Sequence, residues 1–508
     1  MDLSSKSLMV VGAGIMGAGI AQVAAQSMRA DGQRVFLQDA REGAAAQAKA
    51  KLACTLRGLV AKGKLTAQAC DSALVRIVPV SSLDAVADFG LGLVVEAIVE
   101  KLDAKRALFQ ELEGLVGEDC VLATNTSSIS VTAIANGLKR PKRLVGMHFF
   151  NPVPLMKLVE VVSGLHTDAA VAQAIFDLSQ VWGKVPVHAK STPGFIVNRI
   201  ARPYYAETLA LLQEQAGTPA LLDACLKTVG FRMGPCELMD LIGHDTNFSV
   251  TNSVYEANFC DKRYVPSLVQ RELVDGGMLG RKSGRGFYRY PEGVPALQAV
   301  SVEPVAMSAA AQAAAHDRHG GVVVQGVHIV PTDGRTACEL ARELATSAVV
   351  VHDRVVGAAA ATAANVGGAG VGRAPALAYA TTAGLSAEQR AVAVAHLLSH
   401  GVEPHEVADT PGLVVARTIA MLINEAADAV HQGVCTPEGA DAAMKLGVNY
   451  PAGPFDWLKA WSTDGVVILL DRLDAHYRGE RYRVSPWLRA RVGSGAFMAS
   501  PGLDQTGL

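Results

Sequence analysis

The sequence has no excess of charge of either sign and no long uninterrupted apolar run. Its 508 residues include 46 Lys and Arg against 48 Asp and Glu, which gives a formal net charge of −2. This balance gives no electrostatic case for nucleic acid or an anionic membrane as a partner. No stretch of about 18 uncharged apolar residues is present, so we expect no membrane span. Hydrophobic residues make up 50% of the chain and charged residues 19%, which fits a soluble globular protein.

The sequence also lacks paired cysteines. Its 8 cysteines are scattered and form no Cys-x-x-Cys pair. That spacing argues against a zinc site or a disulfide framework and suits a reducing compartment. The residues after Met1 do not have the layout of a signal peptide, because the first apolar run ends in glycines. We therefore expect a cytoplasmic protein without a metal site.

The N-terminal part of the chain alternates short apolar runs with helix-like segments. This alternation is typical of a parallel sheet with crossover helices, so we predict a Rossmann-like α/β domain over residues 1–190. A Thr-Pro-Gly break at 192–194 ends the pattern, and the helical periodicity that follows predicts an all-α domain over residues 191–290. The apolar runs of the first domain lie at residues 8–11, 35–37, 93–95, 121–123 and 144–149.

The second half of the chain repeats part of the first. The Thr-Pro-Gly at 192–194 recurs at 410–412. Coincidence in an alanine-rich chain is the alternative, but several matches at one spacing favour an internal duplication. Further matches at this spacing are Arg199 with Arg417 and Glu207 with Glu425.

The duplication predicts the organisation of the remaining chain. Residues 291–385 are rich in Ala, Val and Gly but keep strand-like runs at 322–330 and 349–356. We interpret them as a degenerate α/β domain rather than a flexible linker, because flexible linkers are poor in β-branched residues. Residues 386–508 are then a second all-α domain that copies the first.

A glycine-rich turn follows the first expected strand and opens a helical segment. Glycine is needed where such a turn is tight, where the backbone meets a pyrophosphate and where helix packs on strand. The helix N-terminus offers N–H groups to the phosphates. A glycine turn without a ligand is the alternative, but the strand-turn-helix context favours a dinucleotide site. Its residues are Gly12, Gly14, Ile15, Met16 and Gly17.

Asp39 ends the next expected strand after the glycine turn. A carboxylate at this position accepts hydrogen bonds from the ribose hydroxyls and repels a 2′-phosphate. The sequence therefore predicts NAD rather than NADP as the cofactor. Arg41 is the one nearby feature that argues the other way.

Two further segments carry residue types that suit hydride transfer from a secondary alcohol. That reaction needs a base for the hydroxyl proton, and histidine titrates near the working pH. His148 stands before an Asn-Pro turn and Glu160 on the strand after it, so the carboxylate can orient the imidazole and stabilise its cation. Ser127 and Asn198 are polar groups that can hydrogen-bond the reacting oxygen.

Each of these residues also has a structural explanation. A strand histidine such as His148 is more often structural than catalytic, and Glu160 can be a solvated strand residue. Ser127 can cap a helix, and Asn198 can fix the start of one. Their joint presence behind a dinucleotide fingerprint favours a dehydrogenase with His148 as the base.

Five segments of the chain together resemble the L-3-hydroxyacyl-CoA dehydrogenase family over residues 1–290. They read VVGAGIMGAGIAQ, VVEAIVEK, NTSSIS, GMHFFNPVPLMKLVEVV and TPGFIVNR. The resemblance implies NAD-dependent oxidation of an acyl-CoA thioester, an L-3-hydroxyacyl-CoA, to the 3-oxoacyl-CoA. The long duplicated form resembles the 3-hydroxyadipyl-CoA dehydrogenases of phenylacetate catabolism and the 3-hydroxybutyryl-CoA dehydrogenases of β-oxidation-type fatty acid metabolism. The acyl chain is left open.

The resemblance also assigns roles to residues of this chain. It implies that His148 takes the hydroxyl proton and that Glu160 pairs with it. It further implies that Ser127 and Asn198 bind the substrate oxygens and that the helical domain of residues 191–290 serves substrate binding or dimerisation. The cofactor contacts that it implies beyond the fingerprint are Glu96, Lys101 and Asn125, and the CoA contacts are Lys62 and Lys64.

The second half lacks the residues for a second active site. Ala416 stands where the repeat has Asn198, and the glycines at 367–372 do not follow the GxGxxG spacing. We therefore predict one active site per chain and a non-catalytic second helical domain. Single-copy members of the family resemble dimers joined through their helical domains, so we expect the second copy to act as an internal pseudo-dimer partner. A homo-oligomer is left open.

Two other functions stay open at the level of sequence. The nearest alternative enzyme is a gulonate dehydrogenase of the crystallin-like branch, although HFFNP followed by MKLVE resembles the thioester branch. The alternative of another class is a non-catalytic NAD-binding structural protein. The joint presence of Ser127, His148, Glu160 and Asn198 argues against it.

Overall fold

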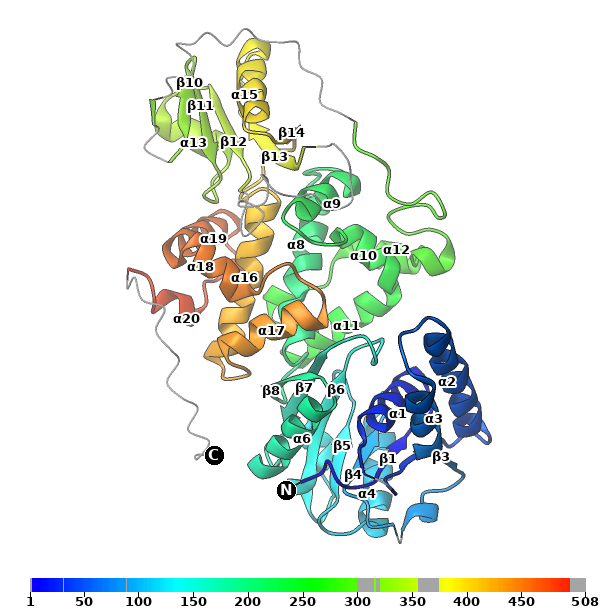
Figure 1. Cartoon of the computed structure of the whole chain (residues 1–508). Helices are drawn as coiled ribbons and strands as arrows, with labels where there is room; N and C mark the ends of the chain where they lie inside the picture. The colour runs from blue at the N-terminus through cyan, green and yellow to red at the C-terminus, as the bar shows by residue number, and fades with distance from the viewer. Residues whose placement is uncertain are drawn as a thin grey trace. The chain divides into compact units, whose positions relative to one another are not determined.

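The protein divides into two compact units. The computed structural model describes residues 2–30, 32–87, 89–298, 315–316, 320–354 and 374–493; the glycines at 367–372 lie outside these ranges. Of the described residues, the first unit consists of those up to 197 together with 433–448, and the second consists of 198–432 and 449–493 (Figure 1).

The first unit is built on an eight-stranded sheet. Its strands are β1 (Leu8–Val11), β2 (Val35–Gln38), β3 (Ile77–Val80), β4 (Leu93–Glu96), β5 (Val121–Thr124), β6 (Leu144–Phe149), β7 (Leu158–Ser163) and β8 (Val185–Lys190). They lie in the order β3-β2-β1-β4-β5-β6-β7-β8. Neighbours pair in parallel except β6 and β7, which are antiparallel.

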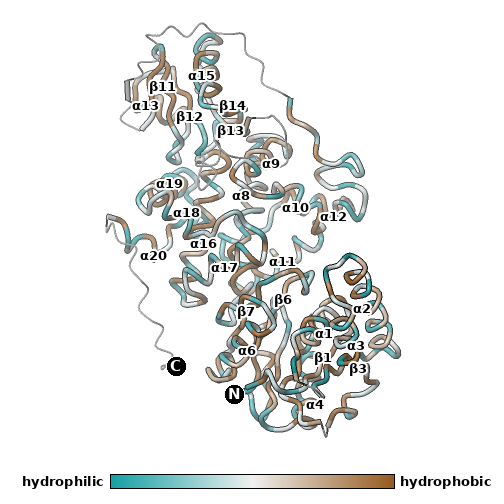
Figure 2. The backbone as a smooth tube through the Cα atoms, in the orientation of Figure 1, coloured by the Kyte–Doolittle hydropathy of each residue, from teal (hydrophilic) through white to brown (hydrophobic). Residues whose placement is uncertain are grey.

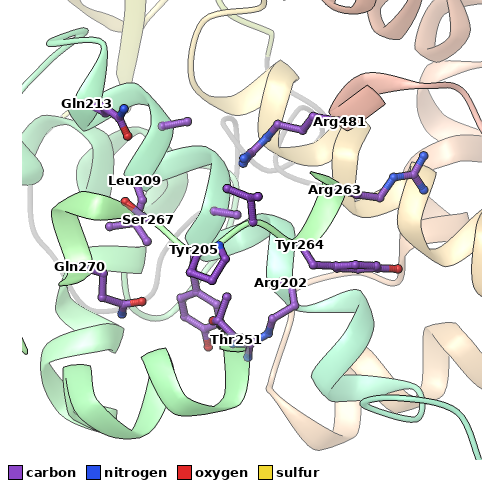
Figure 3. Close-up of a pocket in the computed structure, with 14 residues that line it drawn as sticks. Arg202, Tyr205, Leu209, Gln213, Thr251, Arg263, Tyr264, Ser267, Gln270 and Arg481 are labelled. Carbon is purple, nitrogen blue, oxygen red and sulfur yellow. Dashed lines mark hydrogen bonds between the residues drawn. The ribbon is translucent and has the colours of Figure 1, made fainter. Parts of the chain in front are cut away.

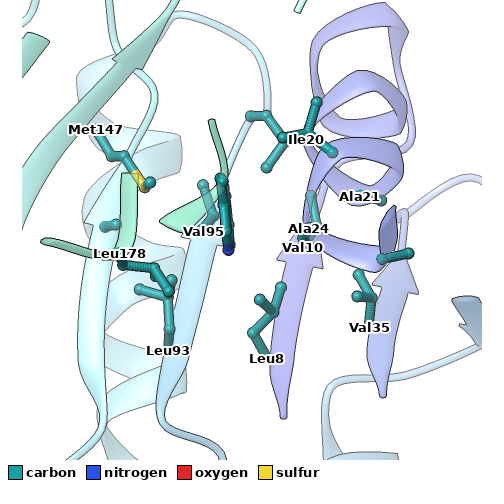
Figure 4. Packing of buried hydrophobic residues seen from close by; sticks show 14 of the residues in the cluster. Leu8, Val10, Ile20, Ala21, Ala24, Val35, Leu93, Val95, Met147 and Leu178 are labelled. Carbon is teal, nitrogen blue, oxygen red and sulfur yellow. The ribbon is translucent and has the colours of Figure 1, made fainter. Parts of the chain in front are cut away.

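The strands are apolar without interruption because crossover helices pack on the sheet and bury them. They are α1 (Ile15–Ser27), α2 (Ala44–Ala61), α3 (Ala67–Arg76), α4 (Leu102–Leu115), α5 (Val131–Ala135) and α6 (Ala169–Val181). Ile20 and Ala24 of α1 belong to one buried cluster with Val10 and Val35 of the sheet (Figure 4). Burial on both faces requires strands that are apolar throughout. The predicted Rossmann-like fold of the N-terminal domain is confirmed.

The second unit contains a smaller, mixed sheet. Its strands are β9 (Ala315–His316), β10 (Val322–Val324), β11 (Val327–Pro331), β12 (Val349–His352), β13 (Ala376–Thr381) and β14 (Glu403–Glu406), in the order β14-β13-β12-β11-β10-β9. Helices α13 (Ala337–Leu344) and α15 (Ala387–Ser399) contact it. Helix α15 has both hydrophilic and hydrophobic segments, teal and brown in Figure 2. The sheet extends past residue 385, where we expected the segment to end, because β14 pairs in parallel with β13.

Two sets of helices follow the two sheets. The first set is α7 (Val197–Ile200), α8 (Arg202–Gln213), α9 (Pro219–Thr228), α10 (Pro235–Ile242), α11 (His244–Ala257) and α12 (Leu268–Asp275). The second set is α16 (Val415–His431), α17 (Pro437–Gly447), α18 (Pro454–Trp461), α19 (Thr463–Tyr477) and α20 (Pro486–Arg489). Helix α16 is buried along most of its length and packs on α8. All of these helices except α17 and the first residue of α7 belong to the second unit.

Buried ion pairs link the two helical sets in a reciprocal way. Arg199 Nε lies 2.6 Å from Glu425 Oε1. Arg417 Nε lies 2.8 Å from Glu207 Oε2. The two arginines are separated by the spacing of the repeat, as are the two glutamates. In a two-fold interface, residue i of one copy contacts residue j of the other, and residue j of the first copy contacts residue i of the second. The helical sets therefore meet as the halves of a dimer do.

Each helical set also covers the sheet of the other half. Helix α17 of the second set contacts β7 and β8 within the first unit, where Lys190 N donates to Val434 O at 2.9 Å. Helix α9 of the first set contacts β13 within the second unit, where Thr228 Oγ1 donates to Ala376 O at 3.1 Å. The exchange of helices was not predicted from the sequence.

In the part of the chain that the structure describes, no helix combines the length and the apolar character needed to cross a membrane. Within the same residues, no group of three or more His, Cys, Asp or Glu side chains is arranged to hold a metal ion.

Candidate active site

The glycine-rich turn is closed on one side and open on the other. Gly12 has a φ of +103°, and a Cβ there would lie 2.3 Å from Ala97 O, so only glycine fits this position. Ala97 directly follows β4, and its N–H donates to Val11 O at 2.7 Å. At Gly14 a Cβ would meet nothing within 4 Å. The open side is where a pyrophosphate can approach the backbone.

The turn lies where the sheet order reverses and where a helix begins. β1 and β4 are neighbours although β2 and β3 come between them in the chain, and such a reversal leaves a crevice at the carboxyl ends of the strands. Helix α1 begins beside it, with no side-chain cap and no acidic residue in its first turn. The backbone N–H groups at its N-terminus are therefore available to hydrogen-bond an anion. Ile15 in that turn is 79% exposed. These features fit the pyrophosphate of NAD.

Asp39 is tied to the glycine turn by hydrogen bonds. Its Oδ2 accepts from Ala13 N at 2.8 Å and its Oδ1 accepts from Arg41 N at 2.9 Å. The Arg41 guanidinium, 3.0 Å from Oδ1, is the main cause that lowers the pKa of Asp39 to about 2. Asp39 is therefore ionised at neutral pH. The guanidinium of Arg41, which in the sequence was the one feature in favour of NADP, forms an ion pair with Asp39.

His148 and Glu160 form a buried pair across the antiparallel strands β6 and β7. The register puts the two residues directly opposite each other, and His148 Nδ1 lies 2.5 Å from Glu160 Oε2. His148 is 6% exposed and Glu160 1%. With Nδ1 donating to the carboxylate, the opposite ring nitrogen Nε2 is the one that can accept a proton.

The second oxygen of Glu160 anchors the chain that follows the sheet. Oε1 accepts from Ile196 N at 3.1 Å and from Val197 N at 3.0 Å. The imidazole also has aromatic neighbours, since the ring centroid of Phe150 lies 4.6 Å and that of Phe195 5.9 Å from that of His148. Glu160 is thus fixed at both oxygens, and the imidazole orientation is fixed with it.

Ser127 belongs to a cluster around Glu100, a residue that the sequence analysis did not single out. Glu100 Oε1 accepts from Thr126 Oγ1 at 2.6 Å and from Ser127 N at 2.9 Å. Burial opposes the ionisation of Glu100, but Lys105 and the hydrogen bonds outweigh it and keep its pKa below the usual range. The available signal was a carboxylate directly before Lys101 in VVEAIVEK. Glu100 fixes the loop that carries Ser127.

Glu96 and Asn125 hold strand ends in place. Glu96 is fully buried, with Oε1 2.6 Å from Lys105 Nζ and Oε2 2.6 Å from Thr124 Oγ1. Asn125 Oδ1 accepts from Phe149 N at 2.9 Å, next to His148. Both residues therefore connect neighbouring strands near their ends, and their contact with the cofactor stays a prediction.

The remaining predicted site residues lie next to α2, at the start of α4 and in α7. Lys62 and Lys64 are exposed beyond the end of α2, and Lys101 is exposed at the start of α4. Asn198 is half-buried in α7 and is the first residue of the second unit, directly after Val197. The roles of these residues toward CoA, ribose and substrate stay predictions.

The second half has an aspartate where the first has its histidine. Asp353 N donates to Ala378 O at 2.8 Å, and Ala378 follows Glu160 by the spacing of the repeat. By this register Asp353 corresponds to His148, and Ala378 corresponds to Glu160. Asp353 accepts from the N–H groups of Val414, Val415 and Ala416. It therefore anchors a helix, and this half has no imidazole–carboxylate pair at the equivalent place.

Comparison with protein families gives matches over both halves of the chain. The model described as "3-hydroxyacyl-CoA dehydrogenase, NAD binding domain" matches residues 7–192. The model described as "3-hydroxyacyl-CoA dehydrogenase, C-terminal domain" matches residues 194–290 and again residues 412–502. The second match lies within residues 386–508, the segment that the repeat predicted.

Similar proteins include one of nearly equal length. The 3-hydroxyadipyl-CoA dehydrogenase of Escherichia coli is 43% identical over 97% of this chain and 98% of its own. The mitochondrial hydroxyacyl-coenzyme A dehydrogenase of Sus scrofa is 40% identical over 56% of this chain and 91% of its own. A crystal structure described as 3-hydroxybutyryl-CoA dehydrogenase from Escherichia coli matches with a TM-score of 0.89 and 42% identity, over 96% of this chain and 98% of that one.

Proposed function

Because the chain belongs to the 3-hydroxyacyl-CoA dehydrogenase family and is an NAD-dependent enzyme of that kind, we propose that His148 and Glu160 form the base with which it oxidises an L-3-hydroxyacyl-CoA. The observation that carries the proposal is the 2.5 Å contact between His148 Nδ1 and Glu160 Oε2. A general base of this type is worth about a hundredfold or more in rate.

The chain's own residues then have distinct tasks. Bound NAD⁺ supplies the hydride acceptor. His148 Nε2 takes the proton of the substrate hydroxyl, and Glu160 holds the ring and stabilises the imidazolium that results. Ser127 and Asn198 hydrogen-bond the substrate oxygens, and Glu100 keeps the Ser127 loop in position. Asp39 binds the ribose hydroxyls, for which its carboxylate is ionised.

The proposed substrate is a short or dicarboxylic 3-hydroxyacyl-CoA. The two Escherichia coli relatives that span the full chain are named for 3-hydroxyadipyl-CoA and for 3-hydroxybutyryl-CoA. A role in phenylacetate catabolism or in β-oxidation-type metabolism, expected from the resemblance, stays a prediction. The cytoplasmic location expected from the sequence stays a prediction.

The second half is proposed to be non-catalytic and to act as an internal partner. Its support is the aspartate at the place of the histidine and the reciprocal pairs Arg199–Glu425 and Arg417–Glu207. Only the first half has the glycine turn with Asp39. Each chain should therefore bind one NAD.

A substrate panel tests the proposed function. NADH oxidation is followed with acetoacetyl-CoA, 3-oxohexanoyl-CoA, a longer 3-oxoacyl-CoA and 3-oxoadipyl-CoA. We expect turnover with at least one of these thioesters and a much weaker reaction with NADPH. Binding of NADH without turnover of any 3-oxoacyl-CoA would contradict the proposal.

A further inference from the structure

A buried lysine in the first unit is absent from the residues that the sequence analysis singled out. Lys105 is the fourth residue of α4, and its side chain is 1% exposed. An ammonium group is costly to remove from water unless carboxylates and hydrogen bonds replace the water. The partners of Lys105 therefore explain why a lysine is buried at this position.

Two carboxylates share this lysine. Lys105 Nζ lies 2.6 Å from Glu96 Oε1 and 3.1 Å from Glu100 Oε2. The side chain of Glu96 is fully buried and that of Glu100 is 37% exposed. Among the described residues, neither carboxylate is recorded in an ion pair with a second cation. One positive charge thus stands against two negative charges, and each carboxylate depends on Lys105 for its counter-charge.

The other oxygens of the two carboxylates are linked through the end of β5. Glu96 Oε2 accepts from Thr124 Oγ1 at 2.6 Å, and Thr124 Oγ1 accepts from Thr126 N at 3.2 Å. Thr126 Oγ1 donates to Glu100 Oε1 at 2.6 Å. These bonds and the two contacts of Lys105 form a closed ring. A polar network of this kind stabilises its members as long as every partner is present.

The ring joins the loop that carries Ser127 to the edge of the sheet beside the glycine turn. Ser127 N donates to Glu100 Oε1 at 2.9 Å. On the other side of the ring, Glu96 is the last residue of β4 and pairs with Val11, which directly precedes the glycine turn. The ammonium group of Lys105 therefore connects these two segments through one carboxylate on each side.

We propose that Lys105 is a positioning residue of the dehydrogenase reaction, and that its charge holds the Ser127 loop in register with the cofactor-binding edge of the sheet. The inference rests on the proposed function, in which Ser127 binds a substrate oxygen. Lys105 acts through Glu96 and Glu100 and is not itself a catalytic residue. A misplacement of about 1 Å can cost about a hundredfold in rate, so the loss of this cation should lower turnover.

The charge balance of the ring predicts how its loss depends on pH. Burial favours the protonated form of Glu100, but the positive charge of Lys105 and hydrogen bonds from neutral groups outweigh it and hold its pKa below the usual range. Among the described residues, Lys105 is the one charged side chain recorded in contact with Glu100. Without Lys105, burial and the neighbouring Glu96 should raise the pKa of Glu100 into the working pH range. Below that pKa, a bound proton would replace the missing cation.

The test measures kcat/KM with acetoacetyl-CoA and NADH between pH 6 and pH 9 in Lys105→Met and in the wild type. We expect the variant to lose about a hundredfold at pH 9 and about tenfold or less at pH 6. The ratio of variant to wild type falls as pH rises, because the proton that replaces the cation is lost. Titration of His148 affects both proteins and cancels in the ratio. If Lys105→Met does not fold, Lys105→Gln carries the same test, because its amide keeps a donor without the charge.

A second substitution should rescue Lys105→Met. In Lys105→Met/Glu100→Gln the excess negative charge is gone, and residue 100 no longer titrates. The amide oxygen can still accept from Thr126 and Ser127, and the amide nitrogen can donate to Glu96. We expect kcat/KM at pH 9 to recover by about tenfold relative to Lys105→Met. The ratio to the wild type should no longer fall with pH.

Arg263 of the second unit provides a matched control. It lines a cavity of about 70 Å³ (Figure 3) and is 3% exposed. Like Lys105, it is a buried cation that faces two carboxylates, those of Glu425 and Asp428. Arg263→Met should lower the free energy of unfolding, but its kcat/KM relative to the wild type should not vary with pH.

The outcomes separate this inference from the proposed function. A loss in Lys105→Met that is equal at every pH, and that Glu100→Gln does not relieve, would show a packing role and overturn the inference. Wild-type kcat/KM in Lys105→Met at every pH would overturn it too, as would the same fall of the ratio with pH in Arg263→Met. A wild type that turns over no 3-oxoacyl-CoA would instead contradict the proposed function.

Discussion

At the scale of single residues, Glu160 connects two parts of the site, because one of its oxygens contacts His148 and the other accepts hydrogen bonds from the backbone of Ile196 and Val197. His148 and Glu160 were expected side by side from the turn between two strands, and the register of β6 and β7 places them opposite each other. The link from Glu160 to Ile196 and Val197 was not expected, because no local pattern indicates which backbone N–H groups a strand carboxylate reaches. The partners of Glu100 were not expected either, because Thr126 and Ser127 follow a different strand, β5.

The choice of cofactor can be tested at Asp39. In Asp39→Ser we expect kcat/KM for NADH to fall by about tenfold or more and the relative activity with NADPH to rise, because the acceptor for the ribose hydroxyls and the repulsion of a 2′-phosphate are both lost. Arg41 is also released from its ion pair. Steady-state kinetics with both coenzymes measures the ratio.

The same residue predicts a pH dependence. Because the pKa of Asp39 is lowered to about 2, titration of Asp39 should not change KM for NADH between pH 5 and 9. An NADH to NADPH ratio that is the same in wild type and Asp39→Ser would argue against the role of Asp39.

At the scale of elements, the sequence predicted the first sheet well and the exchange of α9 and α17 not at all. Apolar runs and glycine turns are local signals, and they mark β1, β2, β4, β5 and β6 directly, whereas β3 was not predicted. Which sheet a helix covers depends on tertiary packing. Gly447 at the end of α17 illustrates this, because a Cβ there would lie 2.7 Å from Leu158 Cδ2 and 3.1 Å from Val197 Cγ2. Nothing near Gly447 in the sequence points to those partners.

At this scale, the buried carboxyl group of Asp353 predicts how the free energy of unfolding depends on pH. Burial raises its pKa from 3.8 to about 6, although hydrogen bonds from Val415 and Ala416 oppose the rise. The folded state then binds a proton that the unfolded state has lost, so the free energy of unfolding falls as pH rises from about 4 to 6. The loss amounts to about 3 kcal/mol.

Asp353→Asn removes this titration. Chemical unfolding at pH 4.5, 5.5 and 7 should show a smaller loss of stability with rising pH in Asp353→Asn than in the wild type. The surface variant Asp84→Asn should keep the wild-type dependence. Parallel curves for wild type and Asp353→Asn would show that Asp353 does not titrate in this range.

At the scale of the whole molecule, the repeat was visible in the sequence but its consequence was not. The constant spacing of the matches predicted a copy of the helical domain, and the family match to residues 412–502 agrees with it. The reciprocal pairing of Arg199 with Glu425 and of Arg417 with Glu207 depends on a long-range arrangement that spacing alone does not specify. It explains why a half without a catalytic pair is retained, since that half neutralises buried charges of the other.

Removal of the second half tests this explanation. A protein of residues 1–290 loses α17 from β7 and β8 and leaves Glu207 without Arg417. A buried ion left unpaired costs about 3–5 kcal/mol. We expect residues 1–290 to dimerise or to aggregate, as measured by sedimentation. A stable, soluble monomer with full activity would contradict an internal partner role.

The central claim, that His148 is the base of a 3-hydroxyacyl-CoA dehydrogenase, is tested most directly by NADH oxidation with acetoacetyl-CoA in His148→Ala. We predict turnover at least about a hundredfold below the wild type with nearly unchanged NADH affinity. His188→Ala is the control, because His188 lies exposed on β8 and stacks on Phe176, and it should keep wild-type turnover. Undiminished turnover in a folded His148→Ala would contradict the account.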